Sequence, residues 1–293
     1  MKKAKLAFAV IFAALIMDTG VYFFYPNVSS LRKRHPARTA FMIYRERQWR
    51  SEGLTGKRIT RRWVPYSRIS PYVKKAILIG EDDKFWRNDG FDVDAIKAAM
   101  LRDIKAGRFK FGASTITQQL ARNLWLSPAK NPLRKIKEAI LAWRLNRDLP
   151  KRRILELYLN EVEWGDGIFG IGAASHHYYG KPAGALTPME AARLAAVLPN
   201  PIRFSPTGAS RYVRNRARAI YGIMAERGAV KVLDEAVTRM EREGPPGDGN
   251  SPGPFSNAAS SNSSAPQIPA AVSNAARDRD INPLSPENQG LAP

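Results

Sequence analysis

The distribution of apolar residues along the chain predicts a mainly α-helical protein. Beyond residue 70 the apolar positions recur every three or four residues, the spacing of one helix face, whereas the alternation typical of strands is scarce. The predicted helices cover about 71–81, 92–106, 132–149, 151–160, 188–198, 211–228 and 230–243. No internal repeat is visible.

Capping residues support several of these boundaries. Ser70 precedes a proline in the first turn of a helix that leads to Glu81, and Asn131 precedes another proline in the same way. The predicted apolar stripe of the helix after Asn131 consists of Leu133, Ile136, Ile140, Leu141 and Leu145. Thr187 and Glu190 have the spacing of a capping box.

The N-terminus has three lysines, an apolar run from Leu6 to Met17, then Asp18 and a second apolar run that ends at Tyr25. Together these runs are long enough to cross a bilayer, with aromatic residues at the far interface. A cleaved signal peptide is less favoured because no small-residue cleavage site precedes Pro26. A buried helix of a soluble protein is the third alternative. The leading lysines favour a cytoplasmic N-terminus.

Composition divides the rest of the chain into three parts. Residues 26–64 are predicted to be a basic connector, residues 65–243 a folded domain, and residues 244–293 a disordered tail rich in Gly, Pro and Ser. The net charge of +21 indicates an anionic partner, such as a membrane surface, nucleic acid or a phosphorylated substrate. The absence of cysteine excludes disulfides and thiolate metal sites.

The segment from Gly112 to Asn123 places six uncharged polar side chains and one arginine between apolar neighbours. So many donors and acceptors suit a sugar or a phosphate. In a purely structural interpretation, Ser114 would be a helix N-cap and the two glutamines would be exposed. Just upstream, Phe109 and Phe111 alternate with cations, a pattern that fits a membrane-contacting loop or, alternatively, base stacking on single-stranded nucleic acid.

Two glutamates are candidate catalytic residues. Glu81 ends an apolar helix beside Asp82 and Asp83, and such crowding of carboxylates in a partly dry site suits a general base. The alternative is a solvated acidic helix end. Glu138 follows Arg134 and Lys135 on a helix, where the three side chains form either an ordinary surface pair or part of an anion site.

Four blocks of the sequence resemble the peptidoglycan glycosyltransferases of glycosyltransferase family 51: Glu81–Asp92, Gly112–Asn123, Arg134–Glu138 and Lys151–Asn160. The resemblance covers roughly residues 65 to 207. Asn88 stands where the family usually has histidine, Ala113 where it has a second glycine, and Arg122 where it has lysine. Proton transfer therefore cannot depend on an imidazole at position 88, and Arg122 would hold a phosphate as a planar fork.

The resemblance implies a lysozyme-like glycosyltransferase domain with a small membrane-proximal lobe. The implied activity is polymerisation of lipid II, the undecaprenyl-diphosphate-linked cell-wall precursor, into linear glycan with inversion at the anomeric carbon. It implies catalytic roles for Glu81, as the general base, and Glu138. The implied substrate contacts are Asp82, Phe85, Ser114, Thr115, Gln118, Gln119, Arg122, Asn123, Arg134 and Lys135, with Phe85 also packing this motif against the core.

Further expectations follow for cofactors, partners and location. No cofactor is required and no metal site is predicted, although Mg²⁺ or Mn²⁺ could share the charge of the diphosphate. The expected partners are lipid II, the growing lipid-linked glycan, the membrane and other cell-wall synthesis or division proteins, but not nucleic acid. We expect a single-pass protein of the inner membrane with its catalytic domain in the periplasm.

Two rival functions remain at this stage, a lysozyme-like glycan hydrolase and a basic membrane-tethered scaffold. The cation-rich block at residues 134–138 argues against the hydrolase, because cleavage of a neutral glycan needs no diphosphate clamp. Net charge alone fits the scaffold but does not explain two glutamates set among cations. The pair His176 and His177 has no acidic partner at metal-ligand spacing, and Ser127-x-x-Lys130 is a chance match to a transpeptidase motif.

Overall fold

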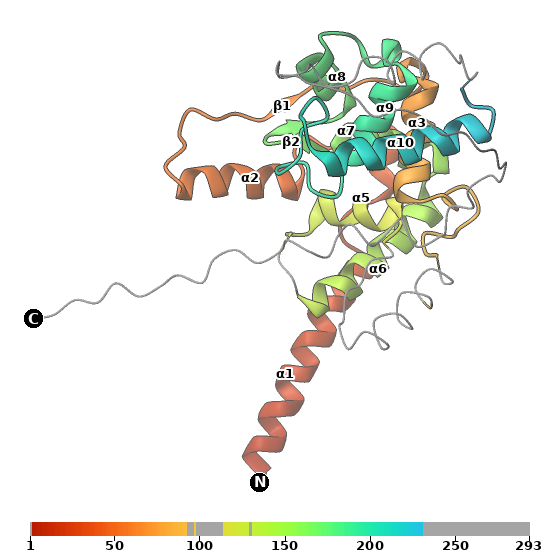
Figure 1. Cartoon of the computed structure of the whole chain (residues 1–293). Coiled ribbons are helices and arrows are strands. Elements are labelled where there is room, and N and C mark those ends of the chain that lie inside the picture. Colours follow the sequence, from red (N-terminus) through yellow and green to blue (C-terminus); the bar gives the residue numbers. More distant parts are fainter. Residues whose placement is uncertain (1, 93–96, 98–113, 129–130, 231–293) are drawn as a thin grey trace, which may run out of the picture. The chain divides into compact units, whose positions relative to one another are not determined.

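The computed structural model describes residues 2–92, 97, 114–128 and 131–230, and within them the chain is mostly helical (Figure 1). The α-helices are α1 (Lys2–Gly20), α2 (Ala40–Ser51), α3 (Pro71–Glu81), α5 (Ile116–Trp125), α6 (Pro132–Asp148), α7 (Lys151–Glu161), α8 (Ile171–Tyr179), α9 (Pro188–Val197) and α10 (Arg211–Glu226). The strands are β1 (Thr60–Arg61), β2 (Glu163–Gly165) and β3 (Ile168–Phe169), and 3₁₀ turns lie at Val21–Phe23, Ser29–Arg32, Tyr66–Arg68 and Ala183–Ala185.

The predicted helix ends agree with the structure wherever capping residues signal them. The Ser70 hydroxyl accepts a hydrogen bond from the Tyr72 amide at the start of α3, and Thr187 and Glu190 form the predicted capping box of α9. Helix α3 ends with Glu81, because the next residue, Asp82, has non-helical backbone angles. This ending turns the chain away from the helix directly beside the candidate base.

Helix α7 lies in the centre of the core. Ile154, Leu155, Leu157, Tyr158 and Leu159 are fully buried along it, since it has neighbours on several sides. Helix α5 packs against both α6 and α7, while α3, α9 and α10 pack side by side (Figure 1). Most of the polar block, from Ile116 to Asn123, therefore lies on a helix that contacts the central one.

Residues 26–64, predicted to be a connector, are instead folded onto the domain. Strand β1 pairs in parallel with β3, and β2 pairs antiparallel with β3. Helix α2 is fixed by Arg45, which donates two hydrogen bonds of 2.9 Å to the Glu163 carboxylate, and by a 3.0 Å bond from the Trp49 indole to Asp166. These contacts join residues more than a hundred positions apart, so no local pattern indicates them.

The apolar stripe predicted for α6 needs one correction. Leu141 and Leu145 are buried, but Ile136 is 51% exposed, and Trp143 on the same helix is 42% exposed. The edge of Trp143 meets the ring of Phe23, with 6.3 Å between ring centroids. Helix α6 therefore has a second apolar region that faces away from the core, next to the residues that follow α1.

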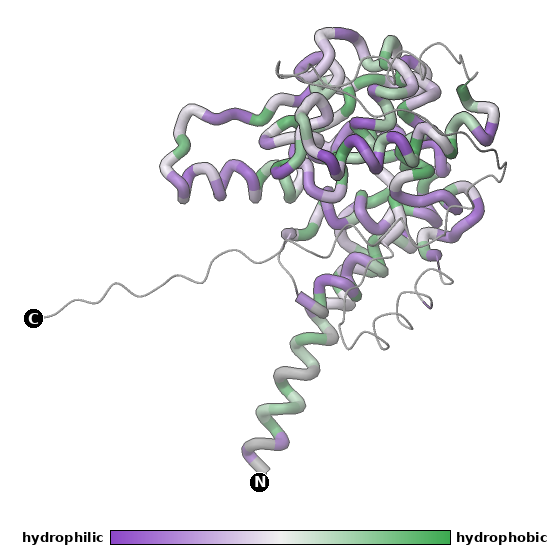
Figure 2. The backbone as a smooth tube through the Cα atoms, viewed as in Figure 1, coloured by the Kyte–Doolittle hydropathy of each residue, from purple (hydrophilic) through white to green (hydrophobic). Residues whose placement is uncertain are grey.

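Helix α1 and its 3₁₀ extension contain one segment, Lys5–Phe23, that is long and apolar enough to cross a membrane, with a mean hydropathy of 2.0. Figure 2 shows this helix as largely hydrophobic along its length. None of the segment is buried against the rest of the described chain, which excludes the buried-helix alternative; an anchor and a signal sequence both remain consistent with it.

Several predictions concern residues outside the described ranges. These are the helix at 92–106, the aromatic residues Phe109 and Phe111, the residues Gly112 and Ala113, the helix at 230–243 and the tail at 244–293.

Gly170 provides a test of how tightly the sheet packs on α7. Its backbone has φ of +81°, and a Cβ atom there would lie 2.5 Å from the Asn160 carbonyl oxygen. We expect Gly170→Ala to lower the free energy of unfolding by roughly 3 kcal/mol, which corresponds to a fall in melting temperature of about 10 °C.

Gly180 is the matched control, because it has φ of +66° but open space around it. Gly180→Ala should cost only about 1 kcal/mol, since strain is its only penalty. Equal melting temperatures for the two variants in detergent would contradict the close packing described here.

Candidate active site

Glu81 lies at the end of α3 with its carboxylate held between two other helices. Its side chain is only 4% exposed. The Gln119 amide of α5 donates a 2.9 Å hydrogen bond to Oε2, and Arg216 of α10 approaches Oε1 at 3.3 Å. A buried carboxylate with two donors is fixed in orientation and retains free lone pairs, because an ionised carboxylate accepts up to about four hydrogen bonds.

Tyr158 of α7 sets the orientation of Gln119. Its hydroxyl donates a 3.0 Å hydrogen bond to the Gln119 side-chain oxygen. Burial raises the pKa of Tyr158 well above its usual value, so the hydroxyl keeps its proton and remains a donor. With its oxygen occupied in this way, Gln119 must present its NH₂ group to Glu81.

Asp82 links the end of α3 to the start of α5. Its carboxylate accepts hydrogen bonds from the Ile116 amide at 3.1 Å and from the Asn88 side chain at 2.9 Å. Burial raises the pKa of Asp82, while these two donors oppose that shift. Asp82 is 7% exposed, so in this structure it organises the backbone around the site.

Asn88 occupies the position of the family's histidine and completes this loop. Its side-chain oxygen accepts hydrogen bonds from the Gly90 amide at 3.1 Å and from Lys151 at 3.0 Å, while its NH₂ group donates to Asp82. Burial lowers the pKa of Lys151. Phe85 is fully buried, with Lys151 above its ring at 4.8 Å from the centroid, so its role in the structure is packing.

The polar block divides into residues that build α5 and residues that face the site. Thr115 and Gln118 form a capping box and are buried, and the Thr115 hydroxyl also donates to the Gly90 carbonyl at 2.7 Å. Asn123 is likewise buried. Ser114, Gln119 and Arg122 are the members of the block that touch or neighbour the candidate catalytic carboxylates.

A cluster of cations surrounds Glu138 on α6. Glu138 is 1% exposed and accepts a 2.7 Å hydrogen bond from Arg134 and a short one from Lys135. Lys135 also donates to the Ser114 hydroxyl at 2.9 Å, which connects α6 to the start of the polar block. The surface-pair alternative for residues 134–138 is therefore excluded, because the shared carboxylate is buried.

Arg122 lies close enough to Glu81 and Glu138 for their negative charges to influence its pKa. Burial lowers its pKa, while the negative charges of Glu138 and Glu81 oppose the shift and the charge of Arg134 adds to it. Its Nε atom is buried without a hydrogen-bond partner, and its guanidinium lies 5.7 Å from the centroid of the Phe41 ring. An arginine ordinarily uses its whole planar fork, so Arg122 has hydrogen-bonding capacity that its protein neighbours do not use.

Two residues of this site are absent from the sequence analysis, Tyr158 and Arg216. Tyr158 lies within the fourth block and Arg216 on the predicted helix at 211–228, but neither is among the predicted site residues. For Arg216 one signal exists, since it stands four positions before Ile220, a buried residue of α10, and therefore on the inward side of that helix. For Tyr158 the apolar pattern of α7 gives no signal, because a tyrosine ring fits a core helix without a functional role.

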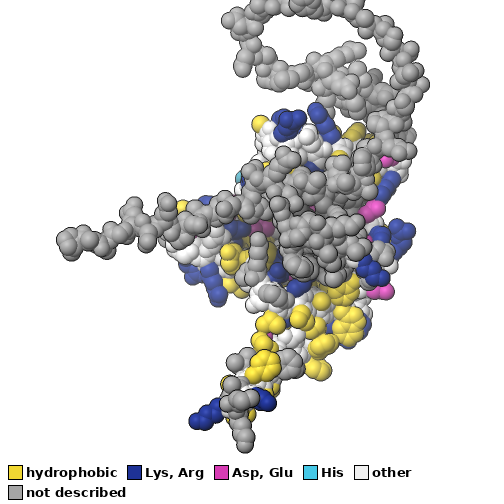
Figure 3. All heavy atoms as spheres, turned by 60° about the horizontal axis from the view of Figure 1, so that its bottom comes forward, with side chains coloured by type: hydrophobic (Ala, Val, Ile, Leu, Met, Phe, Trp, Pro, Cys, Tyr) yellow, Lys and Arg dark blue, Asp and Glu magenta, His cyan; other side chains and the backbone are white. Residues whose placement is uncertain are grey.

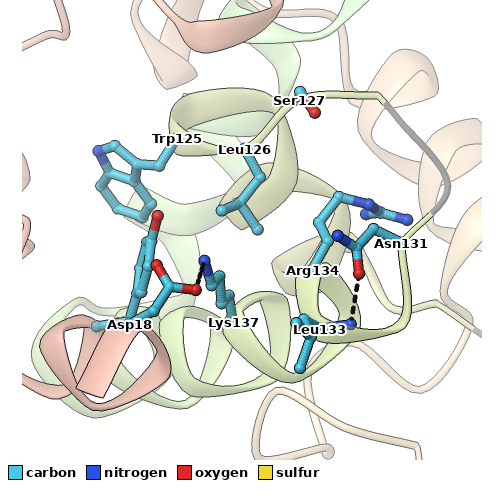
Figure 4. A pocket seen from close by; sticks show the side chains of 9 residues that line it. Asp18, Trp125, Leu126, Ser127, Asn131, Leu133, Arg134 and Lys137 are labelled. Carbon is cyan, nitrogen blue, oxygen red and sulfur yellow. Dashed lines mark hydrogen bonds and ion pairs between the residues drawn. The ribbon is translucent and has the colours of Figure 1, made fainter. Parts of the chain in front are cut away.

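A cavity of about 250 Å³ lies beside the cation cluster, between the end of α1, the end of α5 and the start of α6 (Figure 4). It is lined by Asp18, Tyr22, Trp125, Leu126, Ser127, Asn131, Leu133, Arg134 and Lys137. Lys137 forms an ion pair with Asp18 across it. The cavity thus combines apolar walls with two basic side chains, next to the end of the apolar helix.

The carboxylates near Glu81 do not converge on a common point that suits a metal ion. Asp82 is occupied by Ile116 and Asn88, and Asp83 pairs with Arg227 on the surface. Among the described residues no group of three or more acidic or histidine side chains is placed to hold a metal.

Comparison with known proteins agrees with this geometry. A family model described as Transglycosylase matches residues 50–225, more than half of the chain. The biosynthetic peptidoglycan transglycosylase of Nitrosospira multiformis is 44% identical over 191 residues, which cover 65% of this chain and 83% of that protein. The proteins of the same name from Neisseria gonorrhoeae and Dechloromonas aromatica are 40% and 47% identical, covering 73% and 57% of this chain and 93% and 72% of their own lengths.

Glu138 tests the assignment of the cation cluster to an anionic ligand. Glu138→Gln removes the internal counter-ion, so we expect the free energy of unfolding to fall by roughly 3 kcal/mol. Pyrophosphate should then raise the melting temperature more in this variant than in the wild type, because the neighbouring cations have lost their anion.

Glu46→Gln is the control, since it breaks an exposed ion pair between Glu46 of α2 and Arg38, which precedes that helix. It should cost less than about 1 kcal/mol and leave the pyrophosphate effect unchanged. An equal response to pyrophosphate in Glu138→Gln and the wild type would contradict an anion site at the cluster.

Proposed function

Since the chain belongs to the transglycosylase family and is a peptidoglycan glycosyltransferase, we propose that it polymerises lipid II into linear glycan strands with release of undecaprenyl diphosphate. The observation that supports this substrate best is the arrangement of one buried carboxylate beside a separate cluster of cations. Hydroxyl attack on a sugar diphosphate needs a proton acceptor on one side and positive charge on the other.

In this proposal Glu81 accepts the proton of the 4-hydroxyl group of the acceptor's N-acetylglucosamine. The oxygen of that hydroxyl attacks the anomeric carbon of the donor's N-acetylmuramic acid, and the bond to the lipid diphosphate breaks on the opposite face. Inversion from α to β follows from attack opposite the leaving group. The hydrogen bonds from Gln119 and Arg216 support this role, because they fix the carboxylate without using all its acceptor sites.

Negative charge develops on the diphosphate as it leaves, and Arg122, Arg134 and Lys135 are the groups we propose to stabilise it. Arg122 has an unpaired buried donor, and the other two already bind a carboxylate, Glu138. Such preorganised cations stabilise the transition state without rearrangement of solvent. Glu138 keeps the cluster together when no substrate is bound, and in the proposal it remains beside the diphosphate to orient Arg134.

We propose that no metal ion is required. Asp82 and Asp83 are committed to protein partners, as described above, and no cluster of acidic or histidine side chains within the described part of the chain could hold Mg²⁺ or Mn²⁺. A divalent ion in this proposal would enter with the diphosphate of the substrate. The polymerisation rate that remains in EDTA measures how well the protein cations alone stabilise the leaving diphosphate.

The protein is a cell-envelope enzyme, and we propose that α1 anchors it in the inner membrane with the catalytic domain in the periplasm. Exposed apolar side chains lie just past the end of α1 and on α6. They form an apolar collar, which we define as Phe23, Phe24, Tyr25, Ile136 and Trp143. Figure 3 shows hydrophobic side chains gathered where α1 meets the rest of the described chain. Large apolar rings at this level suit a membrane interface.

Glu81→Gln tests the base directly. It removes the proton acceptor but keeps the shape of the side chain, so the protein should fold and bind lipid II while polymerisation falls by 10²-fold or more. The measurement is the rate at which purified protein converts lipid II into glycan polymer.

Asp83→Asn is the matched control, because Asp83 lies two residues away, is 47% exposed and pairs with Arg227. It should retain nearly full activity. A Glu81→Gln protein with more than about a tenth of wild-type activity would exclude Glu81 as the base, and shortening of preformed glycan by the wild type would favour the hydrolase.

The collar predicts a second membrane contact besides the anchor. A chain that lacks residues 1–17 should still associate with anionic vesicles, since the collar remains. Adding Phe24→Ser and Trp143→Ser should release it with little change in melting temperature, because both rings are exposed. If the truncated chain never binds vesicles, the collar does not contact lipid. The same assay with Phe109→Ser and Phe111→Ser tests the other predicted membrane contact.

A further inference from the structure

The Glu81 carboxylate has two protein partners, and the one that has no place in the four sequence blocks is Arg216. This arginine lies on α10, 135 positions after Glu81. Its Nη2 atom donates to the Gly80 carbonyl at 2.8 Å and approaches Glu81 Oε1 at 3.3 Å. The side chains of Arg216 and Glu81 are only 14% and 4% exposed, so water screens the pair weakly.

The contacts of Arg216 are poorly optimised for a purely structural role. Its Nε atom is buried without a hydrogen-bond partner, although an arginine that ties two helices together ordinarily uses its full fork. An unpaired buried donor costs about 1–3 kcal/mol. Despite this cost, Arg216 is held where its Nη2 atom reaches both the Gly80 carbonyl and the Glu81 carboxylate at the end of α3.

Gly80 lies where α10 packs against the last turn of α3. A Cβ atom on Gly80 would lie 3.3 Å from Ile220 Cδ1, a tight contact, and 3.9 Å from Arg216 Nη2, an ordinary one. The two helices are therefore closely packed at the point where the guanidinium reaches Glu81.

We propose that Arg216 is a positioning residue for Glu81. It holds Oε1 while Gln119 holds Oε2, so that the remaining lone pairs face the acceptor hydroxyl. This inference rests on the proposed role of Glu81 as the base. Arg216 contacts the base and not the diphosphate cluster, so its loss should lower kcat and leave KM for lipid II nearly unchanged.

A second arginine, at the C-cap of the same helix, provides a matched control. Arg227 forms a two-pronged ion pair with Asp83, the prong between Nη2 and Oδ2 measuring 3.0 Å, and its side chain is 53% exposed. It therefore connects α10 to the same stretch of chain without touching Glu81. Loss of Arg227 reports the cost of loosening α10 alone.

The experiment compares Arg216→Gln, Arg216→Lys and Arg227→Gln in the full chain, measuring kcat, KM for lipid II polymerisation and melting temperature. We expect kcat of Arg216→Gln to fall about 10²-fold, the scale of a misplacement of 1 Å, with KM within about threefold of the wild type. Arg216→Lys keeps the positive charge and should recover at least about tenfold of that loss. Arg227→Gln should keep its kcat.

Three results would overturn the inference: a kcat for Arg216→Gln within about threefold of that for Arg227→Gln, a loss confined to KM, or equal losses of kcat for the Gln and Lys variants. If Arg216→Gln does not fold, Arg216→Lys decides alone: kcat within about tenfold of the wild type supports the proposal, and a larger loss overturns it. An active Glu81→Gln protein removes the proposed base itself, whereas an inactive Glu81→Gln with normal Arg216 variants removes only this inference.

Discussion

The hydrogen bond from the Ile116 amide to the Asp82 carboxylate is the contact on which the rest of the site depends. It joins the residue after the end of α3 to the first residue of α5. Because Glu81 precedes Asp82 and Gln119 follows Ile116 by three positions, this single bond brings the Glu81 carboxylate and the Gln119 amide to the same place. Tyr158 then fixes the amide from the core, so the orientation of the Glu81 carboxylate derives from buried groups on three helices.

The second principle of the site is an excess of positive charge around a buried carboxylate. Arg134 and Lys135 both bind Glu138, Arg122 lies close enough to be influenced by its charge, and burial lowers the pKa of Arg122. Such an arrangement is costly for the buried Arg122, because a buried cation loses hydration. In the proposed function, a substrate with two phosphates offsets that cost on binding, so the charge pattern would favour the substrate-bound state.

Much of the fold and of the candidate site could be predicted from the sequence. Most of the features that could not be predicted depend on contacts between residues far apart in the chain. Helix α3 and its final glutamate follow from Ser70, a first-turn proline and a regular apolar stripe, all local signals. The cation cluster follows from the i,i+3 and i,i+4 spacing around Glu138. Arg216 and the folding of residues 26–64 could not be predicted in this way, since both depend on contacts between residues more than 95 positions apart. Ile136 was misassigned because periodicity identifies an apolar face without stating whether protein or lipid covers it.

Asn88 cannot titrate, so this position of the loop beside Glu81 does not respond to acidity. Its amide donates to Asp82 and accepts from Lys151, so it bridges an anion and a cation with one uncharged group. A neutral imidazole could form the same two bonds, but on protonation it would lose its acceptor and would repel the lysine. Between about pH 5 and 8, where imidazoles gain or lose a proton, the amide keeps one hydrogen-bonding pattern. At position 88, where the family usually has a histidine able to respond to pH, this chain therefore has a side chain that does not.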